Sequence, residues 1–287
     1  MERPNAWKSY SPEQLEELDE LCEGYKAFIS DNKTERECVA TAINLATEAG
    51  YRDLRQVIAA GEALHPGDKV FSSVRGKSLM LVQLGTQPLE AGVNILGAHV
   101  DSPRLDVKQN PLAESHEIAT LDTHYYGGIK KYQWVTIPLA IHGVIAKKDG
   151  TTVSVTVGED ECDPVLCVSD LLIHLAKKQM EKAGREVIEG EQLDVMVGNK
   201  PLDGEEKDAV KANVLRIARE VAGIEEEDLL SAELEVVPAG AARDLGLDRS
   251  MILGYGQDDR SCAYPSLLAQ LACEAPKRTA EIGRAHV

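Results

Sequence analysis

The stretch VNILGAHVDSPRLD, Val93–Asp106, decides how the rest of this chain is interpreted. Its first half is a short apolar run closed by Ser102-Pro103, which predicts a strand buried in a mixed or parallel sheet. His99 and Asp101 lie at the end of that strand, and residues i and i+2 of a strand point to the same face. Open α/β sheets place their ligand sites at such strand ends. A histidine there can bind zinc while the carboxylate orients its ring, and the plain alternative is an ordinary hydrogen-bonded histidine.

Composition excludes several classes of partner. The chain has 287 residues and a formal net charge of -17, so we expect no nucleic-acid partner and no anionic membrane surface, since phosphate contact needs a basic face. No apolar run is long enough to span a bilayer. The six cysteines form no C-x-x-C pair, and the polar N-terminus does not resemble a signal peptide. These features favour a cytoplasmic protein with reduced thiols.

The first hundred residues are predicted to form helices and then strands. Ser11 with Gln14 and Thr34 with Glu37 form two capping boxes, each of which marks a helix start. Gly50 is placed as a helix-ending glycine. We therefore expect helices over about 11–30, 34–49 and 53–60, and strands near 69–73, 78–84 and 93–98.

The middle of the chain has a different character. Strand signals dominate residues 123–145, and TTVSVTV at 151–157 alternates strictly. Helices are expected over Leu166–Lys182 and Lys207–Val221, and a strand over Ala232–Pro238. We interpret residues 106–247 as a β-rich domain inserted into a first domain made of residues 1–105 and 248–280.

A second acidic cluster follows the insertion. A short apolar strand, Met251–Leu253, leads through a glycine-rich turn to Asp258 and Asp259, and a helix is expected from about Ser261 to Cys273. Two carboxylates at a helix start have a plain explanation in capping and in compensation of the helix dipole. The arrangement nevertheless mirrors that of the first strand end, so the two clusters are candidates for neighbours in one sheet.

Four segments together resemble bacterial members of the aspartyl aminopeptidase family, which also contains vacuolar aminopeptidase I. They lie in order, at family-like spacing, within a resemblance that covers essentially residues 1–279. The segments are GAHVDSPRLDVK at 97–108, HYYGGIKKYQW at 124–134, DLLIHLAK at 170–177 and YGQDDRSCAYPSLLA at 255–269.

The resemblance implies a fold and a site. The expected fold is α/β, a three-layer α/β/α zinc-exopeptidase domain, incomplete here, interrupted by a β-rich domain used in assembly. His99 is expected to bind one of two zinc ions and Asp258 to bridge both, with Asp101 orienting His99. A cis peptide is expected between Asp258 and Asp259. His174 matches a histidine that family members extend into a neighbouring subunit's active site, and its plain alternative is an ordinary helix residue.

The resemblance also implies activity and assembly. A two-zinc exopeptidase would remove N-terminal amino acids from peptides through a metal-activated water. The family name suggests acidic N-terminal residues, and neutral ones such as leucine stay open. Family members assemble from dimers into dodecamers, so a homo-oligomer is expected.

The sequence departs from the family near its last residues. The proton-accepting glutamate and the remaining ligands of the family are expected beyond Thr279. The seven residues 281–287 instead match a common sequencing-adapter read-through, so we interpret them as an artefact and do not assign Glu281 or His286 as ligands. His99 and Asp258 alone are too few for a tetrahedral site, and an incomplete sheet exposes an edge and apolar surface. We therefore expect this polypeptide to be inactive and poorly soluble.

Two alternative functions stay open. One is another two-zinc amidohydrolase on the same scaffold, such as a deacylase, which would cleave N-acyl amino acids rather than aminoacyl substrates. The other is a non-catalytic assembly module, in which the inserted domain and His174 serve oligomer contacts only. A nucleophilic hydrolase is disfavoured, because no G-x-S-x-G motif occurs.

Overall fold

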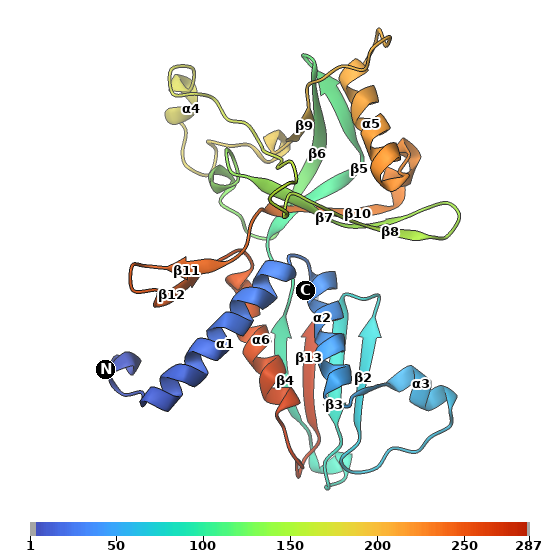
Figure 1. Ribbon diagram of the computed structural model, residues 1–287, viewed down its shortest axis with the longest axis vertical. Coiled ribbons are helices and arrows are strands. Elements are labelled where there is room, and N and C mark those ends of the chain that lie inside the picture. The colour runs from blue at the N-terminus through green and yellow to red at the C-terminus, as the bar shows by residue number, and fades with distance from the viewer. Residues whose placement is uncertain (1–3, 286–287) are drawn as a thin grey trace. The chain divides into compact units, whose positions relative to one another are not determined.

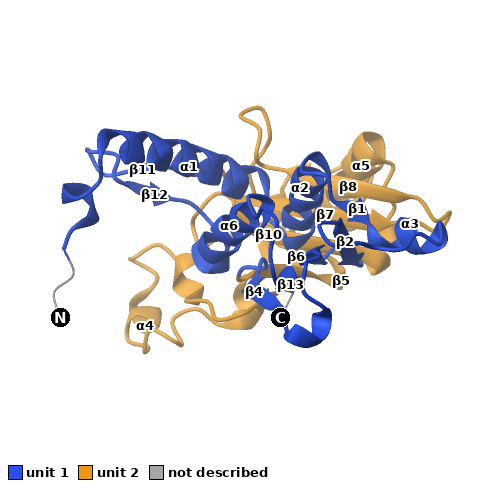
Figure 2. Cartoon of the chain, turned by 90° about the horizontal axis from the view of Figure 1, so that it is seen from below, with its two compact units in different colours: residues 1–102, 241–287 blue, residues 103–240 orange. Residues whose placement is uncertain are grey.

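A computed structural model describes residues 4–285 and divides the chain into two compact units (Figure 2). Unit 1 comprises residues 1–102 and 241–287, and unit 2 comprises residues 103–240. Residues 241–247, which the sequence analysis assigned to the insertion, lie in unit 1. Among the described residues, the helices all fall short of the length and apolar character that crossing a bilayer requires.

Unit 1 is built on a five-stranded mixed sheet with the order β1-β2-β3-β13-β4 (Figure 1). β4 runs parallel to β13, and β13 runs antiparallel to β3. The strands are β1 (Arg52–Asp53), β2 (Lys69–Val74), β3 (Ser78–Gln83), β4 (Asn94–His99) and β13 (Ala280–Ala285). A separate hairpin pairs β11 (Arg243–Leu245) with β12 (Met251–Leu253).

Helices pack on one face of this sheet (Figure 1). Both predicted capping boxes are present, at Ser11 and at Thr34, and Gly50 follows the second helix with a φ of 87°. The helical elements are η1 (Ala6–Lys8), α1 (Pro12–Asp31), α2 (Glu35–Glu48), α3 (Leu54–Ala59), η2 (Leu89–Ala91) and α6 (Gln257–Leu271). The helices expected near 11–30, 34–49, 53–60 and 261–273 are therefore confirmed.

The register of the strands places one buried row under these helices. Phe71, Leu81 and Ile282 are aligned across neighbouring strands, and all three belong to the hydrophobic core of the unit. On the opposite face Met80 and Ile95 are exposed. The described residues thus form an α/β fold with helices on one side of the sheet. These are two layers, one of helices and one of strands, of the three layers expected for an α/β/α domain.

The prediction that Val93–Ala98 is a buried strand is wrong for the described chain. β4 lies at the edge of the sheet, and Ile95 and Leu96 are 63% and 43% exposed. An apolar run predicts burial on both faces only when strands and helices surround it, and here β4 is bonded to β13 alone. Burial begins one residue after the strand, at Val100 and Asp101.

Most of the residues interpreted as an artefact form an interior strand of the sheet. Strand β13 includes residues 281–285 and pairs with both β3 and β4, and Ile282 is 1% exposed. No strand was predicted there, so that part of the interpretation is wrong. The origin of these residues stays a prediction, and His286 lies outside the described residues.

Unit 2 is a six-stranded antiparallel sheet with the order β8-β7-β10-β5-β6-β9. Helix α5 (Ala209–Ala222) packs on β5, β6 and β9. The strands are β5 (Arg104–Ser115), β6 (Ile118–Tyr126), β7 (Leu139–Ala146), β8 (Thr152–Val157), β9 (Val195–Gly198) and β10 (Ala232–Pro238). Short helices are η3 (Lys131–Gln133), α4 (Lys177–Met180), η4 (Gly190–Gln192) and η5 (Glu226–Ser231).

The helix predicted over Leu166–Lys182 is wrong apart from the four residues of α4. Leu166 and Cys167 form isolated bridges to β7 and β9, which satisfy their backbone groups without a helix. Leu171–Leu175 follows with its apolar side chains exposed. Most of the stability of a helix comes from burying its apolar face, and the described residues leave this segment uncovered.

Candidate metal centre

His99, the last residue of β4, is held by the two residues that follow it. Its Nδ1 lies 3.1 Å from the main-chain oxygen of Asp101 and 3.3 Å from Oδ1 of the same residue. Asp101 is 4% exposed, whereas the His99 side chain is about one-third exposed. Two acceptors at Nδ1 favour the tautomer with its proton there, which leaves the lone pair of Nε2 free to bind a metal.

The second segment of the site is the start of α6. Asp258 and Asp259 are joined by a cis peptide bond, as the resemblance implied. Both residues have non-helical backbone angles, so the regular helix begins after them. The Asp258 carboxylate is 83% exposed, and its Oδ1 lies 3.5 Å from His99 Nε2. The strand end and the helix start therefore meet, as the sequence suggested they would.

The three side chains form a group that fits a metal ion. His99, Asp258 and Asp259 each offer one ligand atom, and these atoms all lie within 4.8 Å of one another. An imidazole nitrogen and carboxylate oxygens are donors that zinc accepts, and partial exposure leaves room for further ligands. Asp259 was not predicted as a ligand. The one feature of the sequence that could have indicated Asp259 as a ligand was its position beside Asp258.

A cavity of about 630 Å³ adjoins this group. Val74, Leu79 and Met80 line it from β2 and β3, and His99 and Asp259 lie at its wall. The Asp259 carboxylate also raises the pKa of the nearby Cys262 thiol, through a hydrogen bond and through its charge. That thiol is therefore a poorer metal donor than the carboxylates beside it.

His174 is placed in unit 2, on the turn before α4. Its side chain is exposed, and the neighbouring Leu172, Ile173 and Leu175 are more than half exposed. The structure therefore brings together His99, Asp101 and Asp258 among the predicted residues, and His174 belongs to unit 2.

A histidine and two carboxylates that meet at a strand end define an α/β protein with a candidate metal site. The chain belongs to the aminopeptidase I zinc metalloprotease family (M18), whose profile matches residues 28–282. A probable M18 family aminopeptidase 1 of Clostridium acetobutylicum is 58% identical over 279 residues, which are 97% of this chain and 60% of that protein.

Solved structures agree with this assignment. The crystal structure of an M18 aminopeptidase from Thermotoga maritima matches 99% of this chain and 61% of its own, with a TM-score of 0.91 and 44% identity. The S. cerevisiae mApe1 dodecamer matches 92% of this chain and 60% of its own, with a TM-score of 0.69 and 19% identity, which supports the fold alone. The chain thus spans about 60% of the length of these relatives.

Proposed function

We propose that this protein is a zinc-dependent aminopeptidase that releases N-terminal amino acids from peptides, acidic residues among them. The observation that carries the proposal is the convergence of His99, Asp258 and Asp259 at one strand end, in a chain of the M18 family. Its six cysteines are free thiols, which agrees with the cytoplasm as its compartment.

In this proposal each side chain has a separate role. Asp101 accepts a hydrogen bond from His99 Nδ1 at its main-chain oxygen, with its carboxylate 3.3 Å from the same nitrogen, and so directs Nε2 toward the metal. The exposed carboxylate of Asp258, beside His99, would hold both zinc ions. When bound, such a zinc pair lowers the pKa of a shared water and polarises the scissile carbonyl.

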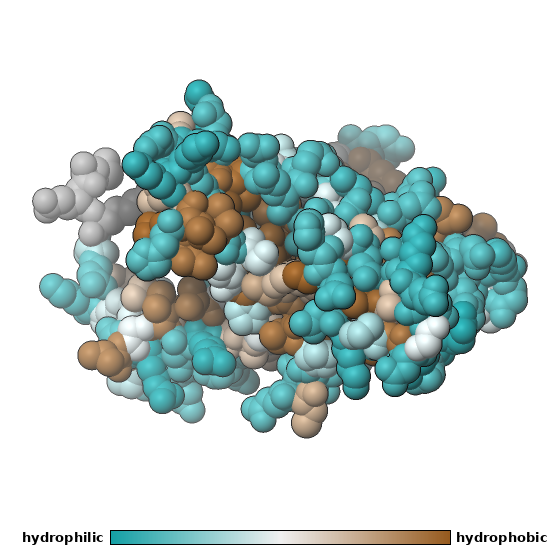
Figure 3. Space-filling view, turned by 90° about the horizontal axis from the view of Figure 1, so that it is seen from above, coloured by the Kyte–Doolittle hydropathy of each residue, from teal (hydrophilic) through white to brown (hydrophobic). Residues whose placement is uncertain are grey.

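Assembly is part of the proposal. The apolar segment Leu171–Leu175 is exposed around His174, and hydrophobic patches interrupt the hydrophilic surface on the face that Figure 3 shows. We propose that this segment contacts another copy of the protein, within dimers assembled into a dodecamer. His174 would then serve a neighbouring subunit's active site.

The chain of 287 residues is proposed to be inactive by itself. Among the described residues of unit 1, Asp258 and Asp259 are assigned to the metal group and the buried Asp101 carboxylate is assigned to orienting His99, so none of these three carboxylates is left to accept a proton from water. A purified preparation of residues 1–287 should release no amino acids from peptides, and measurable zinc-dependent release would contradict this.

The function is tested on the protein made from the source gene, sequenced past the codon for Ala280. That protein should release N-terminal residues from unblocked peptides, and His99→Ala should reduce the rate at least a hundredfold, about the upper end of the cost of disturbing a metal site. His65→Ala, at an exposed histidine of unit 1, is the matched control and should leave the rate unchanged.

Two outcomes would favour the alternatives. Cleavage of N-acyl amino acids, with no action on free amino termini, would indicate a two-zinc amidohydrolase of another kind. Absence of bound zinc from the intact protein would indicate an assembly module.

A further inference from the structure

The two segments that carry the metal group are tied to each other by reciprocal hydrogen bonds. Ser102, three residues after His99, donates from Oγ to the main-chain oxygen of Asp258 at 2.7 Å. In return Arg260, two residues after Asp258, donates from Nε to the main-chain oxygen of Val100 at 2.9 Å. A side chain of each segment therefore donates one hydrogen bond to a main-chain oxygen of the other segment.

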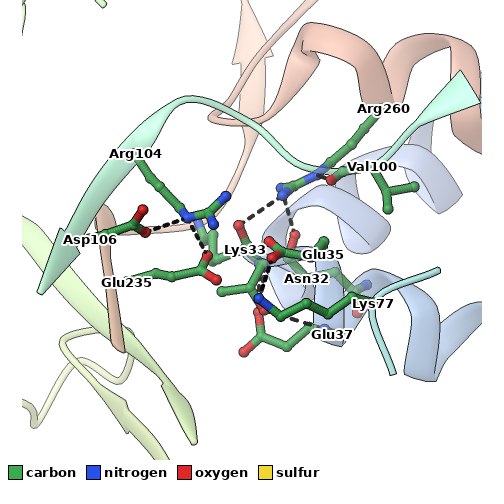
Figure 4. A network of polar contacts seen from close by, with 11 residues as sticks. Asn32, Lys33, Glu35, Glu37, Lys77, Val100, Arg104, Asp106, Glu235 and Arg260 are labelled. Carbon is green, nitrogen blue, oxygen red and sulfur yellow. Dashed lines mark hydrogen bonds and ion pairs between the residues drawn. The ribbon is translucent and has the colours of Figure 1, made fainter. Parts of the chain in front are cut away.

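Arg260 also ties both segments to a third element. Its Nη1 and Nη2 donate to the main-chain oxygens of Asn32 and Lys33, each at 2.8 Å (Figure 4). These two residues form the connection between α1 and α2. The side chain of Arg260 is wholly buried, and its guanidinium lies 5.6 Å from the ring centre of Tyr255.

The connection between α1 and α2 provides a rigid anchor. Asn32 Nδ2 donates to the oxygen of Phe28 at 2.7 Å, and Thr41 donates to Asn32 Oδ1 at 2.6 Å. Glu37 accepts from the backbone N–H groups of Lys33 and Thr34 within the capping box. Both carbonyls that Arg260 reaches therefore belong to backbone that is fixed from the opposite side.

We infer that Arg260 and Ser102 are positioning residues of the metal centre, which set the separation between His99 and Asp258. The planar guanidinium of Arg260 donates in three directions at once, to one carbonyl after β4 and to two carbonyls of the α1–α2 connection, whereas a lysine ammonium lacks this fixed geometry. Burying a charge is costly, and a helix start needs no such group for capping. The inference rests on the proposed function, because it presumes that His99 and Asp258 bind metal.

Cobalt(II) titration of the protein made from the source gene tests the inference, with visible absorption as the readout of metal binding. Arg260→Lys and Ser102→Ala should each weaken Co²⁺ binding by about 10- to 100-fold, the usual effect of losing a group that orients metal ligands. Ser102→Ala keeps the test valid if Arg260→Lys fails to fold. Circular dichroism of each metal-free variant establishes that it is folded.

Gln270→Leu is the matched control. Gln270 is buried on the same helix and donates to Tyr51 Oη and to the oxygen of Ala280, away from His99 and Asp258. It should lower the melting temperature and leave the Co²⁺ dissociation constant unchanged, which separates positioning from general stability.

Three outcomes distinguish the claims. Weakened binding in every Arg260 and Ser102 variant that folds, with the Gln270 control unaffected, supports the inference. Unchanged binding in a folded Ser102→Ala variant overturns the positioning role and leaves the proposed function standing. No Co²⁺ binding by the unsubstituted chain, or binding that survives His99→Ala, overturns the proposed metal site and the inference with it.

Discussion

Gly256 shows how one residue shapes the start of the site. It precedes α6 with a φ of 90°, and a Cβ at this position would lie 2.4 Å from Arg260 Nη1. Glycine is therefore favoured at position 256 for two reasons: the backbone is in the left-handed region, and the Arg260 guanidinium occupies the space that a Cβ would need. The sequence indicated a turn here, but it did not indicate that a buried arginine fills the space beside the glycine.

We predict that Gly256→Ala destabilises the folded protein more than Gly50→Ala does. Gly50 has a similar positive φ of 87° with nothing within 4 Å of its Cβ position, so its substitution costs only the backbone strain, about 1 kcal/mol. At position 256 the collision with Arg260 adds at least about 1 kcal/mol. Urea unfolding of the two variants measures the difference, and equal free energies of unfolding would contradict the prediction.

At the scale of elements, the sequence predicted correctly those helices and strands that depend on local signals. It predicted wrongly those that depend on tertiary context. The capping boxes at Ser11 and Thr34 and the alternating strand at 152–157 were predicted correctly, because their signals lie within a few residues. Burial of β4 and a helix over Leu166–Lys182 were predicted wrongly. Both depend on surfaces elsewhere that would cover an apolar run, which periodicity does not reveal.

For the candidate site too, the sequence predicted what depends on local signals and missed what depends on tertiary structure. The spacing of His99 and Asp101 on one strand indicated a histidine with an orienting carboxylate, and the adjacent pair at 258–259 indicated a second cluster. The contribution of Asp259 and the bonds made by Arg260 depend on backbone geometry at a helix start. A one-dimensional pattern carries no information about that geometry.

The hairpin of β11 and β12 supplies a pH-dependent contact with α1. Hydrogen bonding to Lys26 lowers the pKa of Asp244, and hydrogen bonds to Asp244 and Glu23 raise the pKa of Lys26. A lowered acid pKa adds stability above its ordinary value of 3.8, and that stability is lost as the pH falls through the folded pKa. The raised lysine pKa adds stability that is lost only as the pH rises through its folded value, above 10.5.

We therefore predict that Asp244→Asn lowers the melting temperature at neutral pH and that this difference shrinks as the pH falls below 3.8 through the lowered pKa of Asp244, because the wild-type carboxyl then becomes protonated. Differential scanning calorimetry at pH 7 and pH 2.5 compares the two proteins. A difference that is equal at both pH values would contradict an ionic contact between the hairpin and α1.

For the whole molecule, the proposed assembly predicts that Leu171–Leu175 is covered by another copy of the protein. Leu172→Glu together with Leu175→Glu should shift the protein from the intact gene toward smaller oligomers, because charges in an apolar contact are costly to desolvate. Val221→Glu, at an exposed valine of α5 outside this segment, is the control. Sedimentation velocity measures the mass, and an unchanged oligomer in the double variant would exclude this segment as a contact.

The most direct test of the metal centre is a zinc anomalous difference map from crystals of the protein made from the source gene, grown with Zn²⁺ and recorded on both sides of the zinc absorption edge. The account predicts a peak between His99 Nε2 and the Asp258 carboxylate, and its loss in crystals of His99→Ala. Ordered density for both side chains without a zinc peak between them would contradict the assignment of His99 and Asp258 as metal ligands.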